Sequence, residues 1–68
     1  MHADRLIRMA NQIATYFSAY PHDEAVAGIS NHLKQFWEPR MLTAMKDHVA
    51  HGGAGLHALV PEAVRKLS

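Results

Sequence analysis

The sequence predicts an all-α fold, a small bundle of three helices followed by a short C-terminal helix, in a single helical domain over residues 1–68. Two observations predict this class. Apolar residues recur every three to four positions along separate stretches, which is the spacing of one helix face. No stretch alternates apolar and polar residues as a half-buried strand does. Prolines and a glycine cluster separate the stretches, so brief connections are expected between helices.

The first stretch predicts a helix from residue 3 to about residue 19. Its apolar arc covers about half of the helical wheel, wider than the roughly 100° stripe that an ordinary surface helix needs. These apolar residues are Leu6, Ile7, Met9, Ala10, Ile13, Ala14, Tyr16, Phe17 and Tyr20. From Met9 to His22 the chain contains no Asp, Glu, Lys or Arg. Either the helix has a wide core face, or it packs between its own core and a partner.

The second helix is expected to follow Pro21, with Asp23 as its N-cap, and to run to about Trp37. Its core-facing stripe consists of Ala25, Val26, Ile29, Leu33, Phe36 and Trp37. Polar residues outside the stripe are Ser30, Asn31, Lys34 and Gln35. Gly28 lies off the stripe, where it costs about 1 kcal/mol relative to alanine. Close approach of another backbone, or simple tolerance, would explain it.

The third helix is expected from Pro39, at its first position, to about His51. Its apolar face carries Met41, Leu42, Met45 and Val49. A glycine-rich loop, residues 52–55, then ends the helix. A last amphipathic segment carries Leu56, Leu59, Val60, Ala63, Val64 and Leu67. Pro61 is expected to divide it into a short turn and a new helix.

The composition limits what the chain can do. A core of this size supplies only about 3–5 kcal/mol of net stability, so small chains usually add disulfides, a metal or a partner. Cysteine is absent, which excludes disulfides, thiolate zinc sites and iron–sulfur ligation by this chain. The formal net charge of +1 argues against a generic nucleic-acid binder. No apolar run is long enough to span a bilayer, so a cytoplasmic protein is expected.

No set of residues forms a recognisable catalytic motif. His48 and His51 share one side of the third helix and could both touch a metal, but the sequence places no third ligand. A small histidine-rich metal-binding protein is therefore one alternative. A DNA-binding regulator is a weaker alternative. The third helix, which would contact the DNA, carries only two basic residues, Arg40 and Lys46, and also the acidic Asp47.

Three motifs in the chain resemble a known family. They are RMANQI at residues 8–13, HLKQFWEPRM at residues 32–41 and HGGAGL at residues 51–56. Their order and spacing resemble the delta subunit of NAD-dependent, molybdenum-containing formate dehydrogenases over nearly the whole chain. The first two motifs are fairly specific, whereas a glycine-rich loop alone is a weak signal.

The resemblance implies a non-catalytic accessory subunit of a cytoplasmic complex that oxidises formate and passes electrons to NAD. It implies no cofactor in this chain. The molybdopterin guanine dinucleotide and iron–sulfur clusters belong to the alpha subunit of such complexes, and the FMN and NAD sites to the beta subunit. The expected partner is the molybdenum-bearing alpha subunit, with no nucleic acid and no membrane.

Two strips of residues are the expected contacts with that partner. The first lies on the initial helix and comprises Arg5, Arg8, Asn11 and Gln12. The second is the corner between the second and third helices and comprises Trp37, Glu38, Pro39 and Arg40. Tryptophan and arginine are the residue types most enriched at interface hot spots. Neither strip is expected to bind a metal or a cofactor.

Overall fold

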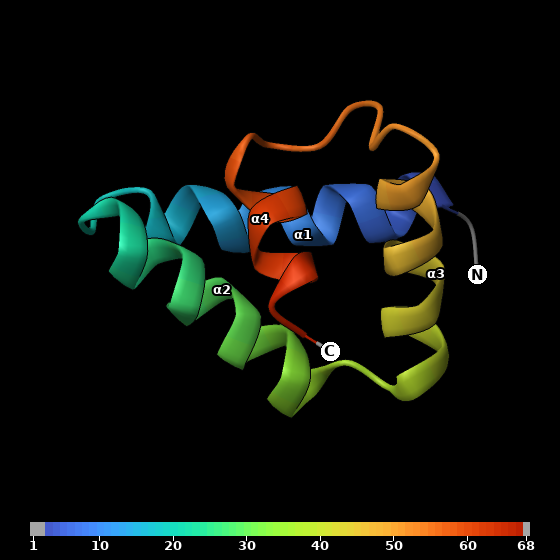
Figure 1. Ribbon diagram of the computed structural model, residues 1–68, viewed down its shortest axis with the longest axis horizontal. Coiled ribbons are helices and arrows are strands. Elements are labelled where there is room, and N and C mark those ends of the chain that lie inside the picture. The colour runs from blue at the N-terminus through green and yellow to red at the C-terminus, as the bar shows by residue number, and fades with distance from the viewer. Residues whose placement is uncertain (1–2, 68) are drawn as a thin grey trace.

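The computed structural model of the chain describes residues 3–67. These residues form the helices α1 (Ala3–Phe17), α2 (His22–Phe36), α3 (Pro39–Ala50) and α4 (Leu59–Arg65) (Figure 1). No strand occurs between residues 3 and 67. The all-α prediction is confirmed, including three longer helices and a short last one.

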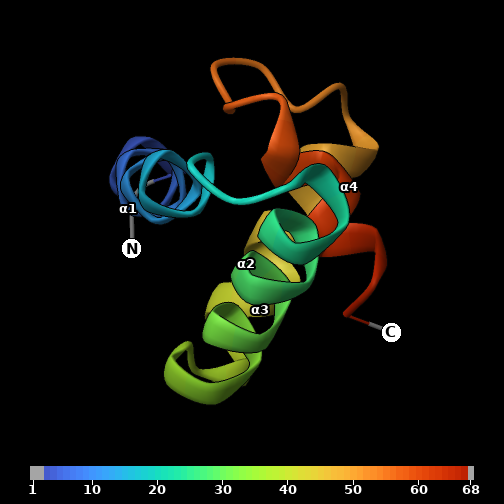
Figure 2. The ribbon, with the colours of Figure 1, turned by 90° about the vertical axis from the view of Figure 1, so that its left-hand side faces the viewer.

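The short helix α4 lies in the middle of the arrangement. It packs against α1, α2 and α3, and the long connection after α3 crosses the top of the molecule in Figure 1 to reach it. Figure 2 views α1 nearly end-on, beside a group formed by the other three helices. One side of α1 therefore faces this group, and the opposite side faces away from it.

All four helices contribute to one hydrophobic core. Its buried side chains are Leu6, Ala10 and Ala14 of α1, Val26, Ile29 and Leu33 of α2, Trp37 of the corner, Met45 of α3, and Val60, Ala63 and Val64 of α4. The buried positions in the middle of α1 are alanines, whose small side chains let α1 lie close to its neighbours. The core thus uses only part of the wide apolar arc of α1.

The connection between α1 and α2 lies about two residues earlier in the chain than the sequence predicted. The first helix ends at Phe17, and the second begins at His22 with Pro21 as its N-cap. The prediction of Asp23 as the N-cap is wrong, because Pro21 already has extended geometry and its carbonyl accepts the first helical bond from the Ala25 N–H at 2.8 Å. Asp23 lies in the first turn, where the helix dipole favours a carboxylate.

Gly28 is explained by a close approach. A Cβ atom at this position would lie 2.5 Å from Cε1 of Phe17, so the aromatic ring occupies the space that any side chain would need. The neighbour that approaches Gly28 is a side chain of α1 and not a backbone. This contact fixes the C-terminal end of α1 against the middle of α2.

The predicted start of α3 is confirmed, since Pro39 is its first residue. At the other end the Gly52 N–H donates to the Val49 carbonyl at 3.1 Å, and the Gly53 N–H donates to the His48 carbonyl at 2.9 Å. This pair of bonds is the Schellman pattern that closes a helix. Gly52 has a φ of 110°, a conformation that favours glycine.

The prediction that Pro61 divides the last segment is wrong. The helix α4 runs without a break from Leu59 to Arg65 and contains Pro61 as its third residue. A proline is tolerated there because the first N–H groups of a helix have no acceptor within the helix. None of the helices in residues 3–67 has the length and apolarity needed to cross a membrane.

The core face of α2 differs from the predicted stripe at two positions. Ser30 is buried, whereas Phe36 is 69% exposed. The helix is covered by both α1 and α4, which shifts its buried side towards Ser30. Phe36 is the last residue of α2, and Trp37, with extended backbone geometry, places the neighbouring ring in the core instead.

Candidate docking surface

Three large hydrophobic side chains among the described residues are exposed. Tyr16 and Tyr20, near the end of α1, are 67% and 47% exposed, and Phe36, at the end of α2, is 69% exposed. Tyr16 lies on the apolar half of α1 as predicted, on the part that the core does not cover. Tyr20 was predicted to lie on the same half, but the helix ends at Phe17 and Tyr20 follows it in the turn. Exposed aromatic side chains at this density are typical of a surface that meets another protein.

A hollow lies between α1, α2 and the start of α3, next to Phe36. It is lined by Met9, Gln12 and Ile13 of α1, His32 and Phe36 of α2, Trp37 of the corner and Met41 of α3. We call the surface formed by Met9, Ile13, Tyr16, Tyr20, His32 and Phe36 the aromatic face. Its members on α1, Met9, Ile13 and Tyr16, recur at helical spacing and so follow one stripe along that helix, and Tyr20 lies in the turn after it.

The rings of the aromatic face support one another. Tyr16 meets the ring of Phe17 edge-on with 5.0 Å between centroids, and the Phe17 and Tyr20 centroids are 5.9 Å apart. At the other end, the rings of His32 and Phe36 lie 4.8 Å apart at an angle of 39°. These contacts restrict the side chains before any partner arrives, which lowers the entropy cost of docking.

The aromatic face is electrically neutral over most of its length. The hollow is lined by no Asp, Glu, Lys or Arg. A hydrogen bond with Tyr16 is the main cause that raises the pKa of Tyr20 above its ordinary value, with smaller contributions from the charge of Tyr16, desolvation and Glu24. Tyr20 therefore stays neutral at physiological pH, and apolar contact is the main interaction that this face can offer.

The predicted strip on α1 is brought together only in part. Arg8, Asn11 and Gln12 line one shallow hollow, and Arg5 does not line it. Asn11 is committed to the chain's own loop, because its Nδ2 donates to the Gly55 carbonyl at 2.9 Å and its Oδ1 accepts from the His57 N–H at 2.7 Å. Asn11 thus holds the glycine-rich loop against α1.

The predicted strip at the corner is also divided. Trp37 is only 6% exposed and belongs to the core, as its place in the predicted core-facing stripe indicated, so little of its ring is open to a partner. Glu38, Pro39 and Arg40 are exposed, and Glu38 Oε2 lies 3.9 Å from Arg40 Nη2. A surface ion pair of this length contributes little to stability, so both charges are available to a partner.

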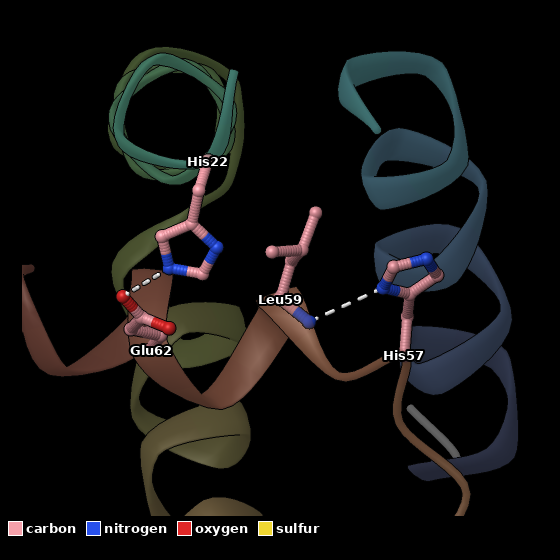
Figure 3. Close-up of polar contacts among 4 residues, drawn as sticks. All are labelled: His22, His57, Leu59 and Glu62. Carbon is pink, nitrogen blue, oxygen red and sulfur yellow. Dashed lines mark hydrogen bonds and ion pairs between the residues drawn. The ribbon is translucent and has the colours of Figure 1, made fainter. Parts of the chain in front are cut away.

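Histidines in residues 3–67 mainly make contacts within the chain. In Figure 3, His22 Nε2 lies 2.8 Å from Glu62 Oε2 and links the start of α2 to α4. The Leu59 N–H donates to His57 Nδ1 at 3.2 Å, which caps the first turn of α4 (Figure 3). His48 Nε2 lies 2.8 Å from the Ala54 carbonyl oxygen, so it helps to hold the glycine-rich loop.

Among residues 3–67, the predicted pair of His48 and His51 gains no third ligand. His51 Nδ1 lies 2.8 Å from the Asp47 carbonyl and 3.5 Å from the Asp47 carboxylate. Over residues 3–67, no group of three or more His, Cys, Asp or Glu residues is placed to hold a metal ion.

Comparison with protein families agrees with these observations. The family model described as the NADH-dependent formate dehydrogenase delta subunit, FdsD, matches residues 5–64 of the chain. The chain belongs to this family. The match covers all of α2 and α3, so the delta-subunit resemblance seen in the sequence motifs is confirmed. No curated protein matches the chain, and neither does any solved structure.

The aromatic face is the feature that sequence reasoning found least well. The uncharged run from Met9 to His22 was compatible with a wide core face on α1 or with an α1 packed between its core and a partner, and Met9, Ile13, Tyr16 and Tyr20 lie within this run. Phe36 gave no such signal, because it shares a predicted stripe with core residues. The delta-subunit family is thus represented here by a small helical chain with one apolar surface that its own core leaves uncovered.

Proposed function

We propose that the chain is a non-catalytic accessory subunit of a cytoplasmic NAD-dependent formate dehydrogenase and docks on the molybdenum-bearing catalytic subunit through the aromatic face. The observation that carries the proposal is the exposure of Tyr16, Tyr20 and Phe36, which lie in α1, in the turn after it and at the end of α2. Membership of a delta-subunit family supports the existence of such a partner.

The size of the chain supports the same conclusion. A core built by 68 residues supplies little net stability, and burying exposed aromatic side chains against a larger subunit adds to it. Anything that binds only the assembled state shifts the equilibrium towards that state by mass action. The proposed effect is therefore to stabilise the assembled complex, whose cofactors are held by its other subunits.

The predicted contact residues near the aromatic face, most of them charged, are proposed as its rim. Arg5 lies one turn before Met9 on α1, and Glu38, Pro39 and Arg40 follow directly after Trp37, which lines the hollow. Arg8 and Gln12 continue the surface around α1. Charges at the rim of an interface mainly set the rate and specificity of docking, whereas the apolar centre carries most of the affinity.

A binding experiment with the purified catalytic subunit tests the proposal. The double variant Tyr16→Ser, Phe36→Ser removes two exposed rings without opening the core, so it is expected to fold. Truncating hot-spot aromatics typically costs about 2 kcal/mol or more each, so the affinity should fall at least tenfold. The matched control is Thr15→Ser, Gln35→Ser, which changes the exposed neighbours of the same two residues.

The outcome is decided by comparing the two double variants. Both should retain the far-ultraviolet circular dichroism of the wild-type chain, which shows that they fold. Equal affinity of the two variants for the catalytic subunit would exclude the aromatic face as the docking surface. Absence of binding by the wild-type chain itself would overturn the choice of partner.

A further inference from the structure

A second groove lies between α3 and α4, away from the aromatic face. It is lined by Lys46, Val49 and Ala50 of α3 and by Val64 and Arg65 of α4. None of these residues lines the hollow between α1 and α2. The groove is therefore a separate feature, and the proposed docking on the catalytic subunit makes no use of it.

The groove combines an apolar floor with cationic edges. Val64 is buried and Val49 is half-buried, so their side chains form the floor. Lys46 and Arg65 are exposed, and each belongs to a different helix. No acidic side chain lines the groove. A ligand that fills it meets valine at the centre and a positive charge on each helix.

The acidic residues nearest in sequence are engaged elsewhere. Glu62 of α4 contacts His22 at 2.8 Å, and Asp47 of α3 contacts His51 at 3.5 Å. The ion pairs found within residues 3–67 include neither Lys46 nor Arg65. These carboxylates are therefore not paired with the two cations of the groove.

We propose that the α3–α4 groove binds an acidic segment of a partner protein. An apolar side chain of that segment lies between Val49 and Val64, and carboxylates on either side of it contact Lys46 and Arg65. The proposal rests on charge complementarity, since a groove with two cations and no anion favours a negatively charged occupant. The guanidinium of Arg65 also suits two-pronged hydrogen bonding to a carboxylate.

A protein segment fits the groove better than a nucleic acid does. Two cations make a small phosphate footprint, and the valine floor offers no aromatic ring on which a base could stack. With apolar docking on α1 and α2 and charged docking on α3 and α4, the chain contacts partner segments on two different surfaces. It would then act as a bridge between them.

A pair of synthetic peptides tests the charge requirement on the full chain. The first is a helix-forming peptide with leucines on one side, flanked by glutamates, and the second carries glutamine in place of each glutamate. The glutamate peptide should bind more tightly at 50 mM than at 200 mM salt, because salt screens exposed charges. Equal binding of the two peptides would overturn the proposal, as would tighter binding of duplex DNA.

Charge reversal then locates the site. Lys46→Glu and Arg65→Glu together should weaken binding of the glutamate peptide roughly threefold to tenfold at low salt, as expected for two exposed ion pairs. The neutral pair Lys46→Gln, Arg65→Gln should lose less and serves if the reversed chain is unstable. Adding a cation with Ala50→Lys, at an exposed residue of the groove, should tighten binding.

The matched control is Lys34→Glu, which changes the net charge as much as Lys46→Glu does. Lys34 is exposed on α2 and does not line the groove. An equal loss for Lys34→Glu and Lys46→Glu would overturn the site. The two proposals fail separately. Peptide binding by the groove variants tests only the proposal about the α3–α4 groove. Binding of Tyr16→Ser, Phe36→Ser to the catalytic subunit tests only the proposal about the aromatic face.

Discussion

Replacing Asn11 by alanine should loosen the connection between α3 and α4. The Asn11 side chain makes two hydrogen bonds to the backbone of the loop, donating to Gly55 and accepting from His57. These bonds join positions that are 44 and 46 residues apart in the sequence. Without these bonds the loop that precedes α4 is held less firmly against α1. Because this loop positions α4 in the core, the substitution should also weaken the packing of α4.

The expected size of the effect follows from the two bonds. Each contributes a net ~0.5–1.5 kcal/mol, so their loss costs roughly 1–3 kcal/mol. Alanine is the better helix former by several tenths of a kcal/mol, up to about 0.7, which offsets part of the loss. The net decrease in the free energy of unfolding should be about 0.5–2.5 kcal/mol. In a domain of this size, each kcal/mol lowers Tm by roughly 4–8 °C.

Two assays separate the local contact from general stability. Urea denaturation, followed by circular dichroism, gives the free energy of unfolding. Amide hydrogen exchange at His57 reports directly on the bond to Asn11 Oδ1, because the His57 N–H is the donor. Asn11→Asp keeps an acceptor for that N–H but loses the donor to Gly55, so it should preserve protection of the His57 amide while lowering stability.

The control for Asn11→Ala is Gln12→Ala, a neighbouring exposed residue that makes none of the loop bonds. Its stability should stay within about 0.5 kcal/mol of the wild type. If Asn11→Ala leaves both the unfolding free energy and the exchange rate of the His57 amide unchanged, Asn11 does not hold the loop, and the reasoning is refuted.

Three further predictions concern packing and ionisation. Gly28→Ala should destabilise the chain, since overpacking against Phe17 costs ~1–3 kcal/mol. In a Phe17→Ala background the same change should stabilise the chain by about 1 kcal/mol, because alanine is the better helix former. Urea denaturation of the wild type, the two single variants and the double variant tests whether the effect changes sign. Trp37→Ala should cost about 3–5 kcal/mol and leave the chain largely unfolded by circular dichroism; a native spectrum would contradict burial of that ring. The pKa of Tyr20 is raised in the folded state, so folding favours the neutral phenol. The stability that this preference contributes is fully present below the ordinary tyrosine pKa and is lost as the pH rises through the raised pKa of the folded state. Tyr16→Phe should return the pKa of Tyr20 towards its ordinary value in an ultraviolet titration, and an unchanged titration would exclude the hydrogen bond.

Much of the fold follows from local signals. Pro39 begins α3 as predicted because a proline at the first helical position gives up no helical hydrogen bond. The glycines after α3 end it because Gly52 adopts a φ that other residues disfavour. In contrast, Pro61 fits inside α4 only because it lies among the first residues of the helix, whose N–H groups have no acceptor within the helix. Predicting this requires knowing that α4 begins at Leu59.

The candidate site was harder to predict, because two adjacent aromatic residues shared one predicted stripe. Phe36 and Trp37 are equally apolar, but the change to extended backbone at Trp37 places that ring in the core and leaves Phe36 exposed. Similarly, the polar character of Asn11 suggested a partner contact, whereas the structure brings a loop from 44 residues away to it. Long-range contacts of this kind have no signature in local spacing.

The most direct test of docking through the aromatic face is a site-specific cross-link. The chain contains no cysteine, so one introduced cysteine carries the only photoreactive maleimide label. Gln12→Cys places the label at the edge of the hollow, and Ala27→Cys places it at an exposed position of α2 that does not line the hollow. The label at residue 12 should cross-link to the catalytic subunit in the assembled formate dehydrogenase, and the label at residue 27 should not. Cross-linking from residue 27 with none from residue 12 would contradict the account.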